Sequence, residues 1–154
     1  MIKSKRKCIG IIFGGESNEH DVSIASTKAI YEAFNSKLNI KKFIVKLFYI
    51  NKNGAWFNND DSLQILKSEQ NAYKKINTYI SSNRLNFLEK IDFNDVEIWF
   101  PLIHGSCGED GTIQGLLRLT QKPFVGSGII GSALGMDKIT MKLIFSHLKI
   151  PQVN

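Results

Sequence analysis

The chain has 154 residues, of which 43% are hydrophobic and 22% are charged, and its formal net charge is +6 at pH 7. This length and composition are typical of one soluble globular domain. The basic residues are spread along the chain without interleaved aromatic residues, and the apolar run 9–13 is too short to span a membrane, which argues against nucleic-acid and membrane partners. Cys8 and Cys107 stand far apart and outside any CxxC pair, so we expect no disulfide framework, no zinc site and a cytoplasmic protein.

The first third of the chain predicts a strand, a loop, a helix and a second strand. Residues 8–13 form a β-branched apolar run, and residues 14–20 are a polar loop led by two glycines without the spacing of a dinucleotide site. A helix is predicted from Asp21, with an apolar face made by Val22, Ala25, Ala29 and Ala33 and widened by Ile30 and Phe34. Residues 42–50 predict a strand, and Asn53-Gly54 predicts that residues 55–57 return antiparallel, which makes a hairpin near residues 45–57.

The next segment has weaker patterns. Residues 58–61 are expected to be a loop, and Leu63 and Leu66 indicate a short helix. Residues 75–80 suggest a strand and residues 85–91 a turn of helix. We expect residues 62–90 to be a variable insertion away from active-site chemistry.

The most informative stretch runs from residue 96 to residue 128. Its apolar start, 96–100, predicts a strand buried on both faces and closed by Pro101. Residues 104–111 form a polar loop with three glycines, and 112–120 have apolar residues at helical spacing, with Asp110 or Thr112 as a possible cap. A buried strand, a glycine loop and a helix start together form the place where open α/β sheets bind ligands.

The last part predicts a short strand over 123–125, a brief helix over 129–134 stopped by Gly135, and a helix capped by Asp137 that runs to Leu148. Alternating strands and helices predict an α/β fold with an open, mostly parallel sheet flanked by helices. Loops 14–20 and 104–111 both follow strand carboxyl ends, so we expect them to converge on one cleft.

Three carboxylates, those of Glu16, Glu19 and Asp21, stand beside the first helix start. A carboxylate there is stabilised by the helix dipole, and one acid is enough to cap a helix. Glu19 sits one residue ahead of the helix, so it could instead project into the cleft toward a cationic ligand group such as an ammonium.

The second loop contains further candidates. His104 could donate to a ligand carboxylate or shuttle a proton. Cys107 could be the nucleophile of a Cys–His pair or an inert small residue. The adjacent acids Glu109 and Asp110 are weak indicators of a metal site, and Lys138, further on, could bind phosphate or be merely exposed.

Four motifs occur together and in order: 13–23 (FGGESNEHDVS), 104–115 (HGSCGEDGTIQG), 123–128 (PFVGSG) and 132–138 (SALGMDK). In these motifs the chain resembles the amino-terminal part of D-alanine–D-alanine ligases. The resemblance implies a Rossmann-like substrate-binding domain over residues 1–135 and the start of a central ATP-grasp domain over residues 136–154.

The resemblance also implies an activity. ATP, with Mg²⁺, phosphorylates the carboxylate of one D-alanine, the amine of a second attacks the acyl phosphate, and the dipeptide enters peptidoglycan synthesis. By resemblance, Glu19 holds the ammonium of the first D-alanine, Ser23 lies beside it, and His104 is close to the same substrate. Lys138 matches a lysine that reaches ATP phosphates. A homodimer through this domain is also implied.

Some features depart from the family or stay open. His20 stands where the family often has arginine, so a cation beside Glu19 is expected to be titratable or lost. The family's magnesium ligands and second-substrate site lie mostly beyond Asn154, so this chain alone is expected to be inactive. The second substrate could be D-alanine, D-lactate or D-serine. The alternatives are a stand-alone α/β binding or dimerisation module without catalysis and a hydrolase that uses Cys107 and His104.

Overall fold

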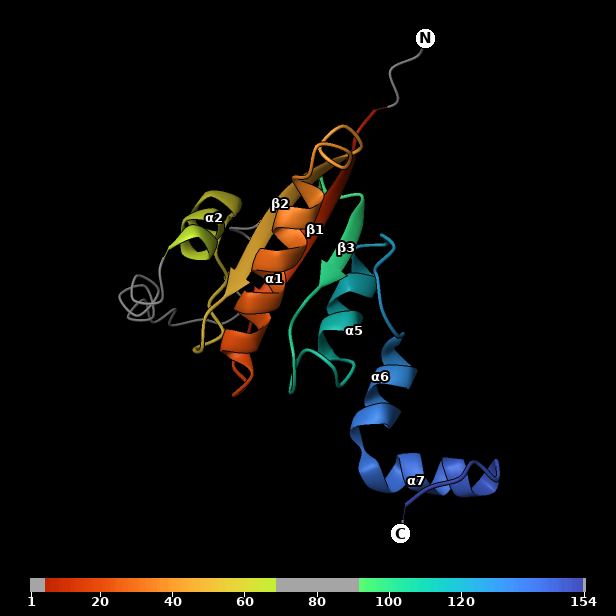
Figure 1. Cartoon of the computed structure of the whole chain (residues 1–154). Helices are drawn as coiled ribbons and strands as arrows, with labels where there is room; N and C mark the ends of the chain where they lie inside the picture. The colour runs from red at the N-terminus through yellow and green to blue at the C-terminus, as the bar shows by residue number, and fades with distance from the viewer. Residues whose placement is uncertain (1–4, 69–91, 154) are drawn as a thin grey trace.

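Three parallel strands form the centre of the fold in the order β2-β1-β3 (Figure 1). The computed structural model describes residues 5–68 and 92–153. β1 (Lys7–Gly14) lies between β2 (Phe43–Ile50) and β3 (Ile98–Pro101), with Ile12 opposite Phe48 and Pro101. Every residue of β1 after Lys7 is buried, because a central parallel strand is covered on both faces.

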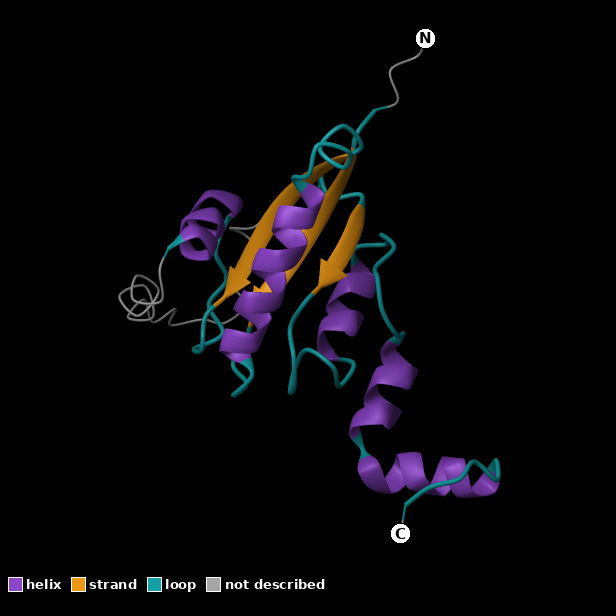
Figure 2. Ribbon diagram, viewed as in Figure 1, coloured by secondary structure: helices purple, strands orange, loops and turns teal. Residues whose placement is uncertain are grey.

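Helices cover the sheet on both sides (Figure 2). α1 (His20–Phe34) and α2 (Asn59–Lys67) pack on one face, against a cluster that includes Ile11, Phe13 and Tyr49. α5 (Thr112–Leu119) packs on the other, where Ile113 and Leu117 join a cluster built around Trp99. α6 (Ile129–Met136) and α7 (Lys138–His147) follow α5. None of the helices in the described ranges is long and apolar enough to cross a membrane.

Gly10 allows the second cluster to form. A Cβ atom on this residue would lie 2.5 Å from the Trp99 ring and 2.8 Å from Val96. The glycine therefore lets the fully buried indole lie directly over β1, and its Nε1 donates a hydrogen bond to Thr120 Oγ1 at 3.1 Å.

The predicted fold class is confirmed, and the first two strands lie within one residue of their predicted bounds. The helix between them begins at His20, one residue early, and its predicted buried face is correct only at Ile30 and Phe34, which pack against the cluster on this side of the sheet. Val22 is 53% exposed, and the three alanines of that face are also exposed. The buried residues of α1 are instead His20, Ser23 and Thr27, because the first two form hydrogen bonds with groups at the strand ends.

The hairpin after β2 is shorter than predicted and reduces to one antiparallel bridge, Ile50 to Trp56. The Asn51 side chain explains the tight turn, since its Oδ1 accepts from the amides of Asn53 and Ala55. The expectation of a loop over 58–61 is wrong. Asn58 Oδ1 accepts from two amides of the first turn of α2, so the helix starts at Asn59 and includes the short helix predicted from Leu63 and Leu66. The elements expected over 75–80 and 85–91 lie outside the described residues.

Three later expectations also change. The predicted strand over 96–100 begins at Ile98 as β3 and ends at Pro101, which is its last residue. The segment 123–125 forms a single bridge, Trp99 to Phe124, and no full strand. α6 continues through Gly135 to Met136. The predicted cap of α7 is confirmed, since Asp137 Oδ1 accepts from the amides of Ile139 and Thr140.

Candidate functional site

The two polar loops lie in contact at the carboxyl ends of β1 and β3. Ser17 Oγ in the first loop donates to the His104 carbonyl oxygen in the second at 2.7 Å. A Cβ atom on Gly105 would lie 2.8 Å from Glu19 Oε2, so that carboxylate lies against the backbone beside His104. The predicted convergence of the loops is therefore confirmed, and it brings Glu19 and His104 to the same place.

Glu19 does not serve as a helix cap. It occupies the N-cap position of α1, but its side chain makes no capping hydrogen bond, and the residue is exposed. The two neighbouring acids point elsewhere. A Cβ on Gly54 would lie 2.5 Å from Glu16 Oε1, and Asp21 lies 3.9 Å from Lys52 Nζ. Of the three carboxylates, Glu19 is the one directed at the second loop.

One side of the His104 ring faces the carboxylate of Glu109. Its Nδ1 lies 3.8 Å from Glu109 Oε1, and the other oxygen of Glu109 accepts from the amide of Gly105 at 2.9 Å. The Nε2 atom is buried and has no hydrogen-bond partner among the described residues. A buried polar atom without a partner is uncommon in proteins, and it is suited to meet a ligand.

Ser23 is fully buried between the two strand ends. Its hydroxyl oxygen accepts from the Gly14 amide at 2.7 Å, and the hydroxyl donates to the Leu102 carbonyl at 2.5 Å. The hydroxyl hydrogen is thus used within the protein. Ser23 ties the end of β1 to the segment that leads from β3 to His104.

The second loop is also fixed by its own side chains. Asp110 accepts from the amide of Cys107 at 2.8 Å and from that of Thr112 at 2.9 Å, so it supports the start of α5 as predicted. Partial burial raises the pKa of Asp110, but hydrogen bonds from the Thr112 and Cys107 amides, the Thr112 side chain and its own backbone together hold the pKa below its ordinary value. Gln114 Nε2 donates to the Gly108 carbonyl at 2.9 Å. The loop therefore has a defined shape without a ligand.

His20 supplies no cation next to Glu19. The ring is fully buried, with Nδ1 2.6 Å from the Gly15 carbonyl and Nε2 3.1 Å from the Tyr49 hydroxyl. A carbonyl can only accept, so Nδ1 carries the hydrogen and Nε2 accepts from Tyr49. Burial lowers the pKa of His20 despite the opposing bond to Gly15, so the neutral ring is favoured. We expected a cation beside Glu19 at this position to be either titratable or lost, and the buried, neutral ring means that it is lost.

Lys138 is not brought together with the loop residues in this way. It is exposed at the first residue of α7, which lies beyond α6 from the sheet (Figure 1). The described residues contain no group of three or more His, Cys, Asp or Glu side chains that could hold a metal ion. The pair Glu109 and Asp110 is used by the loop itself, through the bonds given above.

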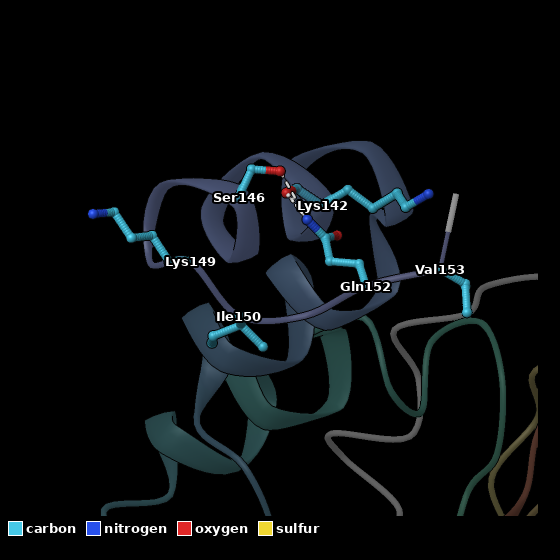
Figure 3. Close-up of a pocket in the computed structure, with 6 residues that line it drawn as sticks. All are labelled: Lys142, Ser146, Lys149, Ile150, Gln152 and Val153. Atoms are coloured by element: carbon cyan, nitrogen blue, oxygen red, sulfur yellow. Dashed lines mark hydrogen bonds between the residues drawn. The ribbon is translucent and has the colours of Figure 1, made fainter.

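A hollow beside α7 lies apart from these residues (Figure 3). Gln152 crosses it and donates to the Lys142 carbonyl at 3.1 Å and to Ser146 Oγ at 2.7 Å. It contains none of the candidate site residues, being lined by Lys142, Ser146, Lys149, Ile150, Gln152 and Val153.

Sequence reasoning missed Ser17, which contacts both candidate residues through its hydroxyl. The one available signal was its position two residues before Glu19 in a glycine-led loop. Glu109 was considered only as a metal ligand, although one of its carboxylate oxygens lies 3.8 Å from His104 Nδ1.

The chain is similar to known proteins over a range that includes both loops. A family model described as "D-ala D-ala ligase N-terminus" matches residues 8–127. A protein named D-alanine--D-alanine ligase from Prochlorococcus marinus subsp. pastoris is 59% identical over 155 residues, which cover 100% of this chain and 44% of that protein. The protein of the same name from Prochlorococcus marinus strain MIT 9312 is also 59% identical, with the same coverage.

Solved structures of ligases also superpose on this chain. The D-alanine-D-alanine ligase from Coxiella burnetii superposes with a TM-score of 0.76 at 28% identity, over 98% of this chain and 44% of that one. The VanG D-Ala:D-Ser ligase from Enterococcus faecalis gives a TM-score of 0.72 at 30% identity, over 94% of this chain and 43% of that one. The chain thus spans less than half the length of these relatives.

Proposed function

The chain belongs to the D-alanine–D-alanine ligase family, and we propose that it forms the amino-terminal, substrate-binding part of an ATP-dependent ligase that joins two D-alanines for peptidoglycan synthesis. In this reaction the carboxylate of the first D-alanine takes a phosphoryl group from ATP. The amine of the second then attacks the acyl carbon, so that a C–N bond forms and phosphate leaves. The chain's own part is to hold the first D-alanine.

Glu19 is proposed to bind the ammonium of that substrate. The observation that carries the proposal is its carboxylate, which makes no capping bond and lies against Gly105 at the meeting point of the two loops. An exposed carboxylate in a preformed corner can accept charge-assisted hydrogen bonds from an ammonium group.

His104 is proposed to face the carboxyl end of the same substrate. With the Nδ1 hydrogen directed at Glu109, Nε2 of the neutral ring can accept a proton, and Nε2 of the protonated ring can donate to a carboxylate. Both uses are supported by the buried, unpartnered state of Nε2 among the described residues. Ser23 supports this arrangement through its two backbone bonds.

ATP is proposed to meet this chain only at Lys138. The carboxylate of Asp137 already accepts from two amides at the start of α7, so the exposed Lys138 ammonium is the group left to contact a phosphate. Mg²⁺ accompanies ATP in the proposed reaction, and the described residues contain no group of three or more His, Cys, Asp or Glu side chains that could hold it. We propose that its ligands come mostly from the rest of the ligase.

Two structural proposals accompany the function. We propose a domain boundary between residues 135 and 136, supported by α7, which contains no buried residue. We also propose that two copies associate through the domain formed by residues 1–135, because α1 leaves Val22, Ala25, Ala29 and Ala33 exposed at helical spacing. Size-exclusion chromatography with light scattering is expected to give the mass of a dimer, and a monomer at all concentrations would contradict this.

We expect the ligase to work in the cytoplasm, where free thiols such as those of Cys8 and Cys107 persist. D-Alanine is the proposed second substrate. The VanG relative is named for D-serine, so the choice is tested by competition between the two amino acids.

The test uses a joined ligase, in which residues 1–154 are followed by the part of the pastoris relative that lies beyond the matched region. Phosphate release that depends on ATP and D-alanine is expected from the joined ligase at a rate comparable to that of the relative, and none above background from the chain alone. An inactive joined ligase would favour a stand-alone binding or dimerisation module. Full activity of the chain alone would also contradict the proposal.

A further inference from the structure

The hydrogen bonds of the sheet end before the first loop reaches Glu19 and before the second reaches His104. The last bond from β1 to the segment after β3 runs from the Leu102 amide to the Ile12 carbonyl at 2.7 Å. Ser23 adds one connection, between Gly14 and Leu102. Beyond that point, the separation of Glu19 from His104 depends on contacts between the loops.

Ser17 makes such a contact to both residues at once. Its hydroxyl donates to the His104 carbonyl at 2.7 Å and accepts from the Glu19 amide at 3.2 Å. The Ser17 carbonyl also accepts from the His20 amide at 3.2 Å, at the start of α1. One half-buried side chain therefore joins the backbone at Glu19 to the backbone at His104.

The space around Ser17 requires a small side chain. Gly105, next to His104, has a φ of +72°, and a Cβ atom on it would lie 3.1 Å from Ser17 Cβ and 3.2 Å from Ser17 Oγ. A larger residue on either side would separate the loops. Serine is small and also carries a hydroxyl that satisfies one donor and one acceptor, which alanine and glycine lack.

We infer that Ser17 is a positioning residue, whose hydroxyl sets the distance between the carboxylate of Glu19 and the imidazole of His104. The inference rests on the roles proposed for these two residues. Ser17 itself does not touch the substrate in this account. Without its hydroxyl, the His104 carbonyl and the Glu19 amide each lose a partner, and the two loops move independently. A small error of placement at a binding site has a large effect on binding and rate.

A purely structural role would lower stability alone, and Ser62 offers a matched control. Its hydroxyl also joins two backbone groups, since it accepts from the Tyr49 amide at 2.8 Å and donates to the Phe57 carbonyl at 3.2 Å. Ser62 is fully buried on the α2 side of the sheet and has no place in the proposed site. Ser17→Ala and Ser62→Ala therefore remove the same kind of bridge from two different regions.

The experiment measures Tm, kcat and the KM for the first D-alanine in the joined ligase. Both variants are expected to lower Tm, while Ser17→Ala alone raises KM by about tenfold or more. Combined with Glu19→Gln, Ser17→Ala is expected to add less than it does alone, because it acts in part through Glu19. Ser17→Cys keeps a weak donor on a slightly larger side chain, so it is expected to give an intermediate KM, and it carries the test if Ser17→Ala does not fold.

Three results would overturn the inference: an unchanged KM in Ser17→Ala, an equal rise in Ser62→Ala, or effects of Ser17→Ala and Glu19→Gln that simply multiply. Failure of the proposed function has a different signature. In that case the joined ligase with the natural residues is inactive, or Glu19→Gln alone leaves KM unchanged.

Discussion

Replacing Gly105 with alanine places a methyl group at the corner where the first D-alanine is proposed to bind. The residue has a φ of +72°, and its Cβ would lie 2.8 Å from Glu19 Oε2. Adopting left-handed backbone costs alanine about 1–2 kcal/mol of stability. The Glu19 carboxylate is the far end of a flexible side chain, so it is expected to move away, and substrate binding is affected in addition to stability.

The expected rise in KM follows from the hydrogen bond between the Glu19 carboxylate and the substrate ammonium. A charge-assisted hydrogen bond contributes about 1.5–3 kcal/mol, so its complete loss raises KM roughly 10- to 150-fold. A displaced carboxylate retains part of this energy. We therefore expect Gly105→Ala to raise the KM for the first D-alanine by about tenfold, the lower end of that range.

Gly54→Ala is the matched control, because that glycine has a φ of +78° and its Cβ would lie 2.5 Å from Glu16 Oε1. The two variants share a left-handed backbone and a neighbouring carboxylate, and differ in which loop they face. Steady-state phosphate release by the joined ligase gives KM, and urea unfolding gives stability. An unchanged KM in Gly105→Ala, or an equal rise in Gly54→Ala, would refute the reasoning.

Three further predictions concern the core, the pH dependence and the free thiol. Gly10→Ala is expected to lower the free energy of unfolding by about 1–3 kcal/mol through overlap with Trp99, whereas Gly115→Ala, whose Cβ meets nothing within 4 Å, is not; equal values in urea unfolding would contradict this. Because burial lowers the pKa of His20, the unfolded chain binds the proton more readily, so stability is expected to fall below pH 6.5 by at most about 1.4 kcal/mol per pH unit. His20→Gln should remove this slope just below pH 6.5, and an unaltered slope would exclude His20 as its source. Cys107→Ala is expected to leave the joined ligase fully active, and loss of activity would revive the Cys–His alternative.

The strands near the site were predictable because buried parallel strands are uninterrupted apolar runs. β1 is close to this pattern, β2 is apolar at every position except Lys46, and their bounds differ from the predicted ones by a single residue. The start of α2 was not predictable from hydrophobicity, since Asn58 and the two aspartates after it are equally typical of a loop. Only the position of the Asn58 side chain, which accepts from two amides, makes these polar residues the start of a helix.

The face of α1 shows a different reason for failure. The pattern of Val22 and the alanines indicates an apolar stripe, but the helix turns His20, Ser23 and Thr27 inward. His20 and Ser23 are buried where they bond to backbone groups at the strand ends, and one of these groups, the Leu102 carbonyl, lies 79 residues from Ser23 in the sequence. The meeting of Glu19 with His104 followed from topology alone. The bond from Ser17 to His104 could not be foreseen, because a serine in a polar loop has many nearby partners.

The claim on which the account depends is that Glu19 binds the ammonium of the first D-alanine. The direct test is the KM for that substrate in the joined ligase carrying Glu19→Gln, with Glu16→Gln as a control whose carboxylate lies by Gly54. The account predicts a rise of roughly 10- to 150-fold for Glu19→Gln, as one charge-assisted hydrogen bond of about 1.5–3 kcal/mol requires, and no change for Glu16→Gln. A KM that stays the same in Glu19→Gln would contradict it.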